Sequence, residues 1–473
     1  MADRRLVVFR ADELARICEG QLLSGSPDQE INSFTIDSRR IEHRDLFLAI
    51  RGNRYDGHDF VYEAIRKEVA GVIVSDRAVV PVNAYTRQGL AVIVVSDTTE
   101  ALQAIARQVR LRSDTQVVAI TGSVGKTTTK ELAAAFVGTR HRVTKNAGNM
   151  NNHIGLPLSL LNLREAPDVA VVELGMNHAG EIRRLVGIAA PNVRVWTNVT
   201  QAHTEFFSSI DAIADAKAEI LEGADTDDHL VVNAGDPLVM ARISSFPGTV
   251  TTFGVDTRAD VSATVLNDKG LDGISASIET REGKARLHSP LIGIGNVANV
   301  LAAICVALRF HVPLDAMLRI VETFEPPPRR GTVHRLSNGV TVVDDSYNSN
   351  PEALQRALQS IGRTRGHRRR VAVLGEMLEL GTNAQAIHLA YGRLAVESGF
   401  GCVVGVGGVN ILALADGARA AGLADDVVMT CNTSEEAADV VATVVKARDL
   451  VMVKGSRGIR TEVVVDRLKA EWG

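Results

Sequence analysis

The stretch Gln116-Val-Val-Ala-Ile-Thr-Gly-Ser-Val-Gly-Lys-Thr-Thr128 decides the fold of this chain. Its β-branched, apolar beginning predicts a buried strand, and a helix is expected to begin at about Lys126. The glycines between them let backbone N–H groups surround phosphate oxygens, while the helix N-terminus and the lysine add positive charge. The pattern predicts a phosphate-binding loop for ATP or GTP, with contacts from Thr121, Gly122, Ser123, Val124, Gly125, Lys126, Thr127 and Thr128.

The loop differs at one position from the common eight-residue phosphate loop. Where that loop has a glycine six positions before the lysine, this chain has Ile120. The tighter spacing Gly-x-x-Gly-Lys-Thr, from Gly122 to Thr127, is present instead. A glycine-rich turn that binds nothing is the alternative, and the residue types on both sides of the loop disfavour it.

Strand and helix patterns alternate around this loop, which predicts an α/β fold with a parallel central sheet. Further strands are expected at 168–174, 193–199 and 229–233, a helix at 296–310, and a small antiparallel insertion at 261–280. The prolines of Glu325-Pro-Pro-Pro-Arg329 mark a linker. Beyond it, strands expected at 340–344, 370–375, 402–406 and 450–454 indicate an open, Rossmann-like α/β domain.

Length indicates three domains, because the chain has 473 residues and a domain averages about 150. We place them at 1–112, 113–328 and 329–473. The first is expected to be a small α/β domain with buried strands at 70–74 and 90–95. A helix with Leu102, Ile105 and Val109 on one face should follow these strands.

Composition excludes several classes of protein. Apolar residues make up 45%, which is too many for a disordered chain, and a net charge of -4 argues against a nucleic-acid binder. The 4 cysteines form no C-x-x-C pair, so neither structural zinc nor a disulfide framework is expected. Residues 1–10 lack the apolar segment of a secretory signal, and no run of 18 apolar residues could span a membrane. We expect a cytoplasmic protein.

Several motifs follow the loop in a characteristic order. They are Asn149-Met-Asn-Asn-His-Ile-Gly-Leu-Pro157, Glu173-Leu-Gly-Met-Asn-His-Ala-Gly-Glu181, Asn198-Val-Thr-Gln-Ala-His-Thr-Glu205 and Ala216-Lys-Ala-Glu219. Together with the tight phosphate loop, this order resembles the Mur ligase family over essentially the whole chain. The resemblance implies ATP-driven amide formation in the peptide stem of the bacterial cell wall.

The outer domains resemble one branch of that family, which joins D-alanyl-D-alanine to UDP-N-acetylmuramoyl-tripeptide. The motifs concerned are Asp37-Ser-Arg39, Asp56-Gly-His-Asp-Phe60, Asp344-Asp-Ser-Tyr-Asn-Ser-Asn-Pro351, Leu374-Gly-Glu-Met-Leu-Glu-Leu-Gly381 and Val453-Lys-Gly-Ser-Arg457. The resemblance thus implies uridine-nucleotide, ATP and dipeptide sites in the first, second and third domains. One alternative is the relative that adds the third stem residue, although its usual Asp-Asn-Pro-Arg motif is missing. The other is a P-loop ATPase switch without ligase activity.

The expected metal site contains oxygen ligands. Glu173 ends an apolar strand beside the loop, where a carboxylate suits magnesium, and the Thr127 hydroxyl can ligate the same ion. The resemblance adds His203 as a ligand of a second magnesium ion and Lys217 as a carbamate formed with carbon dioxide. It assigns catalysis through an acyl phosphate to Lys126, His203, Lys217 and Arg330.

The remaining contacts are implied by the resemblance, and each has an ordinary structural alternative as a cap, a turn or a solvated charge. Nucleotide contacts fall to Asn296, Arg330, Asp345 and Asn348, and substrate contacts to Ser38, Arg39, Asn151, Asn152 and Tyr347. Two positions depart from the family pattern: Gly295 replaces a usual histidine, and Arg329 replaces a usual glycine. A monomer is expected.

Overall fold

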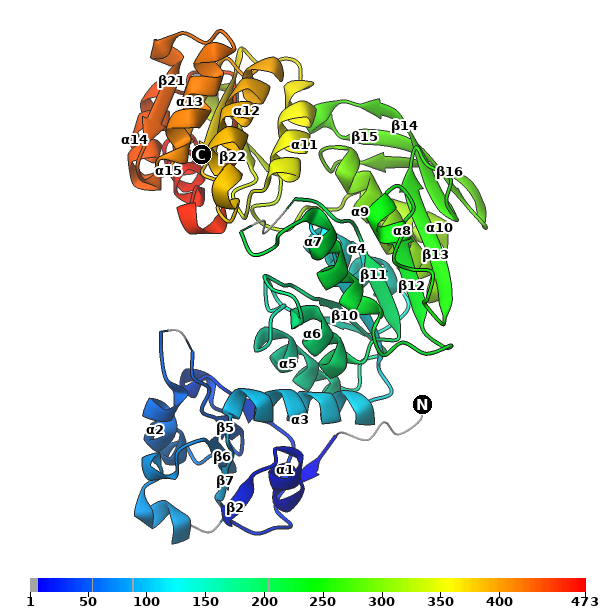
Figure 1. Ribbon diagram of the computed structural model, residues 1–473, viewed down its shortest axis with the longest axis vertical. Coiled ribbons are helices and arrows are strands. Elements are labelled where there is room, and N and C mark those ends of the chain that lie inside the picture. The colour runs from blue at the N-terminus through cyan, green and yellow to red at the C-terminus, as the bar shows by residue number, and fades with distance from the viewer. Residues whose placement is uncertain (1–6, 53, 87–88, 202–204) are drawn as a thin grey trace.

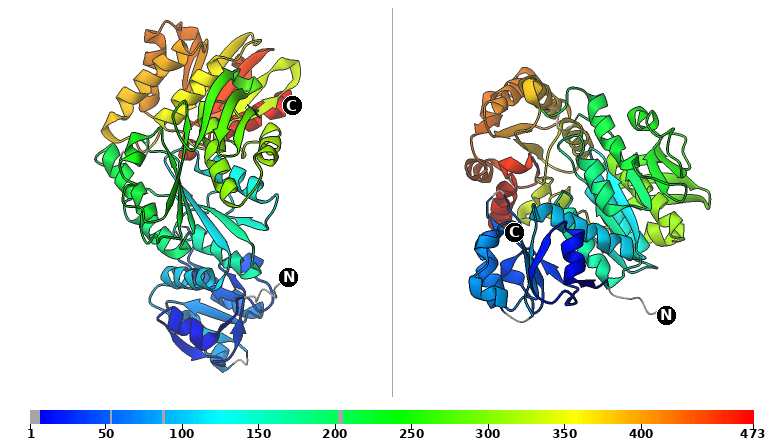
Figure 2. Two further views of the ribbon diagram at one scale, coloured as in Figure 1. Left: turned by 90° about the vertical axis from the view of Figure 1, so that its right-hand side faces the viewer. Right: turned by 60° about the horizontal axis from the view of Figure 1, so that its bottom comes forward.

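The computed structural model describes residues 7–52, 54–86, 89–201 and 205–473. These residues form three α/β units, each built on its own main sheet, stacked along the long axis of the molecule (Figure 1 and the left view of Figure 2). The N-terminal unit lies at one end and the C-terminal unit at the other. The expected α/β class is confirmed.

The N-terminal unit contains a five-stranded sheet in the order β2-β7-β6-β5-β4, in which only β2 is antiparallel to its neighbour. Its elements are β1 (Phe9–Arg10), α1 (Ala11–Ile17), β2 (Gln21–Ser24), β3 (Glu30–Ile31), β4 (Phe34–Thr35), β5 (Leu46–Leu48), α2 (Val61–Arg66), β6 (Gly71–Val74), β7 (Ala91–Val94) and α3 (Thr98–Arg112). The strands β6 and β7 are buried or nearly so, as their apolar runs predict, and β5, which was not predicted, is buried as well.

The central unit contains a nine-stranded sheet in the order β16-β15-β14-β13-β12-β11-β8-β10-β9. Its strands are β8 (Gln116–Thr121), β9 (Val143–Lys145), β10 (Val169–Glu173), β11 (Val193–Trp196), β12 (His229–Asn233), β13 (Thr249–Val255), β14 (Val261–Asp268), β15 (Ile274–Thr280) and β16 (Gly283–Ser289). Its helices are α4 (Lys126–Val137), α5 (Gly155–Leu160), α6 (Glu181–Ala189), α7 (Ile210–Ala218), α8 (Pro237–Met240), α9 (Ile294–Arg309) and α10 (Leu314–Glu322). All neighbouring strands are parallel except at β14–β15 and β15–β16.

The segment expected to form a small antiparallel insertion does contain an antiparallel pair, β14–β15, and this pair extends the central sheet. The strand β14 pairs in parallel with β13, and β15 and β16 continue the same sheet in antiparallel fashion. The reason is that β13, which the sequence patterns did not reveal, supplies a parallel edge onto which β14 adds. The β14–β15 turn, Gly270–Asp272, then reaches the C-terminal unit, where Leu271 joins the core.

The C-terminal unit contains a six-stranded sheet in the order β17-β18-β22-β19-β20-β21, antiparallel only at β17–β18. Its elements are β17 (Thr332–Arg335), β18 (Thr341–Asp344), α11 (Pro351–Gly362), β19 (Arg369–Gly375), α12 (Ala384–Glu397), β20 (Cys402–Val406), α13 (Asn410–Ala420), β21 (Val428–Cys431), α14 (Ser434–Val444), β22 (Asp449–Lys454) and α15 (Glu462–Trp472). Helices pack on both faces of this sheet, which is the expected open α/β arrangement.

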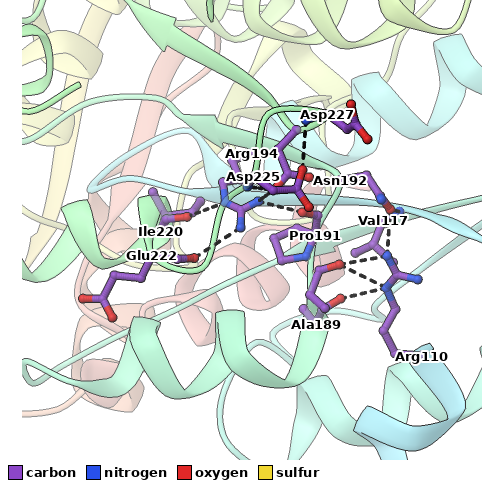
Figure 3. Close-up of polar contacts among 12 residues, drawn as sticks. Arg110, Val117, Ala189, Pro191, Asn192, Arg194, Ile220, Glu222, Asp225 and Asp227 are labelled. Atoms are coloured by element: carbon purple, nitrogen blue, oxygen red, sulfur yellow. Dashed lines mark hydrogen bonds and ion pairs between the residues drawn. The ribbon is translucent and has the colours of Figure 1, made fainter. Parts of the chain in front are cut away.

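Helix α3 joins the first unit to the second. Its residues Leu102, Ile105 and Val109 are buried, as the helical pattern predicts, in a core shared by both units. Near its end, the buried Arg110 donates hydrogen bonds to the carbonyls of Ala189 and Ala190 and to the Asn192 side chain (Figure 3). Asn192 accepts the N–H of Val117, so α3 is tied to the amino end of β8.

A second buried arginine lies beside this contact, at the amino end of the central sheet. Arg194 of β11 is 1% exposed and is surrounded by acceptors (Figure 3). They are the carbonyls of Pro191, Ile220 and Glu222 and the carboxylate of Asp228. Because 220 and 222 directly follow α7, this arginine fixes the end of that helix against the sheet.

Two further expectations concern cysteines and membranes. The four cysteines are buried and free. Among the described residues, no helix is long and apolar enough to cross a membrane.

Candidate active site

A cleft of about 1420 Å³ lies at the carboxyl ends of the central strands, between the central and C-terminal units. The central unit contributes the loop after β8, the end of β10 and the start of α9. The C-terminal unit contributes the linker arginine Arg330, the turn after β18 and the turn after β22. Parallel sheets bind ligands outside their carboxyl ends, so this cleft is the candidate active site.

The phosphate loop has the backbone that its sequence predicts. Gly122 and Gly125 have φ values of 147° and 89°, which side chains rarely adopt, and Gly125 caps α4. A Cβ atom at Gly122 would lie 1.9 Å from Thr197 Oγ1, and one at Gly125 would lie 2.1 Å from Asn299 Oδ1. Both glycines are therefore required by space as well as by conformation.

Thr197 and Asn198, which directly follow β11, form hydrogen bonds to the phosphate loop. Asn198 accepts the N–H of Val124 at 2.9 Å and donates to its carbonyl at 2.9 Å, and the Thr197 hydroxyl donates to the same carbonyl at 2.8 Å. The Asn198 carbonyl accepts the N–H of Ser123. These bonds hold the loop in shape without a ligand, which lowers the entropy lost on binding one.

Lys126 folds back over the loop. Its Nζ donates to the carbonyls of Gly122 at 2.7 Å and Ser123 at 3.3 Å. Burial lowers the pKa of Lys126, Arg330 lowers it further, and Glu173 opposes the change. An anionic phosphate at this point would favour the charged lysine, so the geometry suits a polyphosphate.

Thr127 and Glu173, both buried, and the partly buried Asn151 form a set of oxygen and amide groups. The Thr127 hydroxyl donates to Glu173 Oε2 at 2.7 Å, and Asn151 Nδ2 donates to Glu173 Oε1 at 2.7 Å. Glu173 is 3% exposed. A hydroxyl and a carboxylate next to a phosphate loop are donors that fit magnesium. Among the described residues, no group of three His, Cys, Asp or Glu side chains could hold a metal, so this pair would need ligand oxygens to complete the shell.

Lys217 lies near the end of α7 and is 2% exposed. Among the described residues its Nζ has neither a hydrogen bond nor an ion pair. Burial and the nearby charge of Lys126 hold the pKa of Lys217 well below its usual value. His203, the other expected ligand of a second ion, lies outside the described residues.

The linker and the C-terminal unit close the other side of the cleft. The Arg330 guanidinium lies over the Tyr347 ring, 4.0 Å from its centroid. Lys454 Nζ donates to Asp345 Oδ2 at 2.6 Å and to the carbonyl of Asn348 at 3.0 Å. Burial raises the pKa of Asp345, and the charge of Lys454 opposes the rise. Lys454 belongs to the motif Val453-Lys-Gly-Ser-Arg457, but nothing in the sequence pattern assigns it a role.

Asn296 and Asn299, at the start of α9, are bonded to each other. Asn299 Nδ2 donates to Asn296 Oδ1 at 2.9 Å, and Asn296 Nδ2 donates to the Ile292 carbonyl at 2.9 Å. Asn296 therefore lines the cleft with a fixed orientation. Asn152 also lines the cleft, but its Oδ1 accepts the N–H groups of Ile154 and Gly155 before α5.

Ser38 and Arg39 lie away from the cleft, in the N-terminal unit. Ser38 is buried, and its carbonyl accepts a hydrogen bond from Lys67 Nζ at 2.6 Å. Arg39 is exposed and donates twice to the Asp37 carboxylate, both times at 2.9 Å. The side chain of Arg39 keeps the pKa of Asp37 at about 2. The structure thus separates these two residues from the other predicted contacts.

Comparisons with known proteins extend over all three units. The model "Mur ligase family, catalytic domain" matches residues 30–110, "Mur ligase middle domain" matches 120–307, and "Mur ligase, glutamate ligase domain" matches 329–457. The UDP-N-acetylmuramoyl-tripeptide–D-alanyl-D-alanine ligase of Bacillus subtilis is 32% identical over 96% of this chain and 97% of its own length. This chain belongs to the Mur ligase family.

Relatives and solved structures of the family agree over the full length. The Synechocystis protein of the same name is 34% identical over 99% of this chain and 98% of its own. MurF from Acinetobacter baumannii has a TM-score of 0.86 at 28% identity, covering 98% of this chain and 99% of that one. MurF ligase from Thermotoga maritima in complex with ADP has a TM-score of 0.81 at 28% identity, covering 93% and 97%.

Membership of the Mur ligase family decides between the classes of function left open by the sequence. The chain is an enzyme, an ATP-dependent ligase that uses ATP, and a switch without ligase activity is set aside. The phosphate loop, which fits ATP or GTP by its residues alone, is accordingly the ATP site.

At both positions that depart from the family pattern, Arg329 and Gly295, the structure shows a contact made by an arginine side chain. Arg329 has a φ of 64°, a conformation that favours glycine, and its guanidinium pairs with Glu462 at 3.1 Å. Gly295 faces Arg356, whose Nη1 lies 3.1 Å from where a Cβ of Gly295 would be. In each case an arginine contact exists at the altered position.

Proposed function

We propose that this Mur ligase joins D-alanyl-D-alanine to UDP-N-acetylmuramoyl-tripeptide with hydrolysis of ATP to ADP and phosphate, a step of peptidoglycan precursor synthesis. The observation that carries this proposal is full-length similarity to relatives of that name, at 32% and 34% identity. Addition of the third stem residue is the alternative within the family. The missing Asp-Asn-Pro-Arg motif speaks against it.

The reaction needs a leaving group on the tripeptide carboxylate. In the proposed course, that carboxylate attacks the γ-phosphorus of ATP, forming an acyl phosphate and releasing ADP. The dipeptide amine then attacks the acyl carbon, the new amide bond forms, and phosphate leaves with the bonding electron pair while the amine loses its proton. Such chemistry depends on positioning and charge neutralisation.

The residues of the cleft supply both requirements. The loop N–H groups and Lys126 hold the phosphates, and Arg330 approaches from the linker, since its charge acts on both Lys126 and Asp345. Thr127 and Glu173 would hold a magnesium ion, which would supply charge neutralisation to the phosphate oxygens. Asn151 orients Glu173, while Tyr347 and Arg330 pack against each other at the acceptor side.

Lys217 is proposed to carry a carbamate. Its lowered pKa leaves a neutral amine that can attack carbon dioxide: an N–C bond forms, one C–O π pair moves to oxygen, and the amine loses a proton. The product is an anionic oxygen ligand in place of a neutral amine. Together with His203, it would hold a second magnesium ion.

Further parts of the proposal concern the outer domains. We assign uridine-nucleotide binding to 1–112 with Ser38 and Arg39, ATP to 113–328 with Asn296, and dipeptide binding to 329–473, where Asp345 and Asn348 also meet the nucleotide. Asn152 lines the cleft and is proposed to contact the muramoyl peptide. The enzyme is proposed to act as a cytoplasmic monomer.

The test is an acceptor assay with purified protein, ATP, magnesium and UDP-N-acetylmuramoyl-tripeptide. Phosphate release should depend on D-alanyl-D-alanine and should yield the pentapeptide product by mass spectrometry. A parallel assay offers UDP-N-acetylmuramoyl-dipeptide with diaminopimelate or lysine. Turnover in that second assay, or phosphate release that ignores the dipeptide, would refute the proposal.

A further inference from the structure

Glu173 lies at the end of β10, at a point where the neighbouring strand on one side has already ended. The edge strand β9 pairs with β10 only as far as Val171, which lies opposite Lys145. On the other side the pairing with β8 continues, and the N–H of Leu174 donates to the Ile120 carbonyl at 2.8 Å. On the β9 side, the main chain of Glu173 therefore needs hydrogen-bond partners that are not part of a strand.

The side chain of Asn146, the residue that directly follows β9, supplies these partners. Its Oδ1 accepts the N–H of Glu173 at 3.0 Å, and its Nδ2 donates to the Glu173 carbonyl at 3.2 Å. The same Nδ2 donates to the Met150 carbonyl at 2.8 Å. Asn146 is fully buried, so these bonds are not exchanged with solvent. One side chain thus fixes both the strand end that carries Glu173 and the loop that carries Asn151.

A buried lysine holds Asn146 in turn. Lys130 lies on α4, one turn after Thr127, and is fully buried. Its Nζ donates to the Asn146 carbonyl at 2.7 Å and pairs with Glu131 at 3.1 Å. Because the Thr127 hydroxyl donates to the Glu173 carboxylate, α4, Asn146 and Glu173 form a closed ring of contacts. The helix that begins at the phosphate loop is therefore tied to the Glu173 strand end by two routes.

The contacts to the carboxylate of Glu173 and those to its main chain differ in how a metal ion would affect them. One carboxylate oxygen accepts the Thr127 hydroxyl, and the other accepts Asn151 Nδ2. A magnesium ion held by Thr127 and Glu173 would compete with these donors for the same oxygen atoms. The bonds from Asn146 go to the main chain, where no metal competes. Asn146 can therefore hold Glu173 in place both with and without the ion.

We propose that Asn146 is a positioning residue for the magnesium site. By fixing the main chain of Glu173, it keeps the carboxylate directed at the phosphate loop. Groups that hold a metal ligand set its orientation, and losing one of them typically weakens metal binding by a factor of about 10 to 100. The inference rests on the proposed magnesium site of Thr127 and Glu173, and it is independent of which amine the enzyme accepts.

Binding of Mn²⁺ to the intact protein in the presence of ADP, followed by electron paramagnetic resonance, tests the inference. Asn146→Leu keeps the branched shape of the side chain and removes its hydrogen bonds, so Mn²⁺ should bind about tenfold more weakly. Binding of ADP without any divalent metal, measured by calorimetry, should be unchanged, because Asn146 does not contact the phosphate loop. An unchanged Mn²⁺ affinity, or an equal loss in metal-free ADP binding, would overturn the inference.

A second variant applies if Asn146→Leu does not fold. Asn146→Ala leaves a polar space that water can fill, so the main chain of Glu173 keeps hydrogen-bond partners but loses the fixed ones. Mn²⁺ should again bind more weakly than to the wild type, and metal-free ADP should bind equally well. A wild-type Mn²⁺ affinity in folded Asn146→Ala would reject the positioning role.

Asn192→Leu is the matched control, because Asn192 also uses its side chain to hold the main chain of a strand, at the amino end of the same sheet. Its Oδ1 accepts the N–H of Val117 at 3.0 Å. This variant should melt at a lower temperature and keep its Mn²⁺ affinity. If it weakens Mn²⁺ binding as much as Asn146→Leu does, a general loss of stability explains the effect and the positioning role is rejected.

The same measurements separate this inference from the proposals on which it depends. A wild-type protein that binds no Mn²⁺ with ADP would refute the magnesium site and the inference together. Failure of the acceptor assay would leave the Mn²⁺ measurements interpretable, since they contain neither tripeptide nor dipeptide.

Discussion

Basic side chains are buried at two places around the central sheet, and their surroundings differ. At the amino ends, Arg194 is 1% exposed, and every side of its guanidinium meets an acceptor (Figure 3). Lys217 of α7 is close enough to the phosphate loop for the charge of Lys126 to lower its pKa; it is 2% exposed and has no bonded partner among the described residues. Arg194 therefore finds its hydrogen-bond acceptors within the protein, whereas Lys217 has no bonded partner in the described part of the chain.

This difference distinguishes a residue that stabilises the fold, Arg194, from a residue that is available for chemistry, Lys217. A buried charge without partners is costly, so a lysine in that position shifts toward its neutral form. The two clusters are also connected, because Arg194 binds the carbonyls of Ile220 and Glu222, just after the helix that carries Lys217. The hydrogen bonds of Arg194 therefore help to fix the position of Lys217.

Removal of Lys217 should have the largest effect on activity. Lys217→Ala is expected to lower the dipeptide-dependent rate at least about a thousandfold, equivalent to about 4 kcal/mol, because the anionic ligand is lost. Formate or acetate should restore part of the rate by occupying the vacated space. Phosphate release measures both effects, and Lys284→Ala, at an exposed lysine of β16, serves as the control. A variant that keeps its rate, or that no carboxylic acid restores, would contradict the carbamate proposal.

Removal of the Arg194 guanidinium should instead affect stability. Arg194→Met leaves Asp228 and three carbonyls without their donor, and breaking such a buried pair costs about 3 kcal/mol of unfolding free energy. Urea denaturation followed by circular dichroism measures the loss. The control is Arg319→Met, whose exposed pair with Asp315 should contribute little to stability. Equal losses in the two variants would show that burial at Arg194 has no special role.

The sequence predicts the elements of this fold better than it predicts these clusters. The strand Gln116–Thr121 and the glycines after it are local patterns, and they form as expected. Arg194 is different, because the run Val193-Arg-Val-Trp196 gives no sign that its arginine is buried. Its partners lie on both sides in the chain, up to Asp228, and only the folded sheet brings them together.

The candidate site shows the same limit. Glu173 and Thr127 could be predicted as neighbours, because a strand end and a phosphate loop share one edge of a parallel sheet. The pairing of Lys454, at the end of β22, with Asp345, just after β18, had no sequence signal. Arg356 likewise looks like an ordinary helical charge until α11 is placed over Gly295.

Replacing Lys217 by an apolar residue of similar length should stabilise the ligand-free protein. Lys217→Met removes a buried amine that has no bonded partner among the described residues and fills the same space, so the free energy of unfolding should rise by about 1 kcal/mol. Lys130→Met is the matched control, since Lys130 is equally buried but donates to the Asn146 carbonyl at 2.7 Å. That variant should lose stability. Destabilisation in both would mean that Lys217 has partners in the ligand-free state.

The smallest effect is expected at an exposed ion pair, because solvent screens its charges, unlike those of the buried side chains Arg194 and Lys217. Asp37→Asn removes the charge that pairs with Arg39, and the loss of stability should be small because Arg39 is largely exposed. The pKa of Asp37 is lowered to about 2, so its contribution is present in full above the ordinary carboxyl pKa and disappears as the pH falls toward about 2. Urea midpoints of wild type and variant should therefore differ equally at pH 7 and pH 5 and converge below about pH 4. A difference that changes between pH 6 and pH 8 would assign the effect to another group, because no carboxylate with a lowered pKa titrates there.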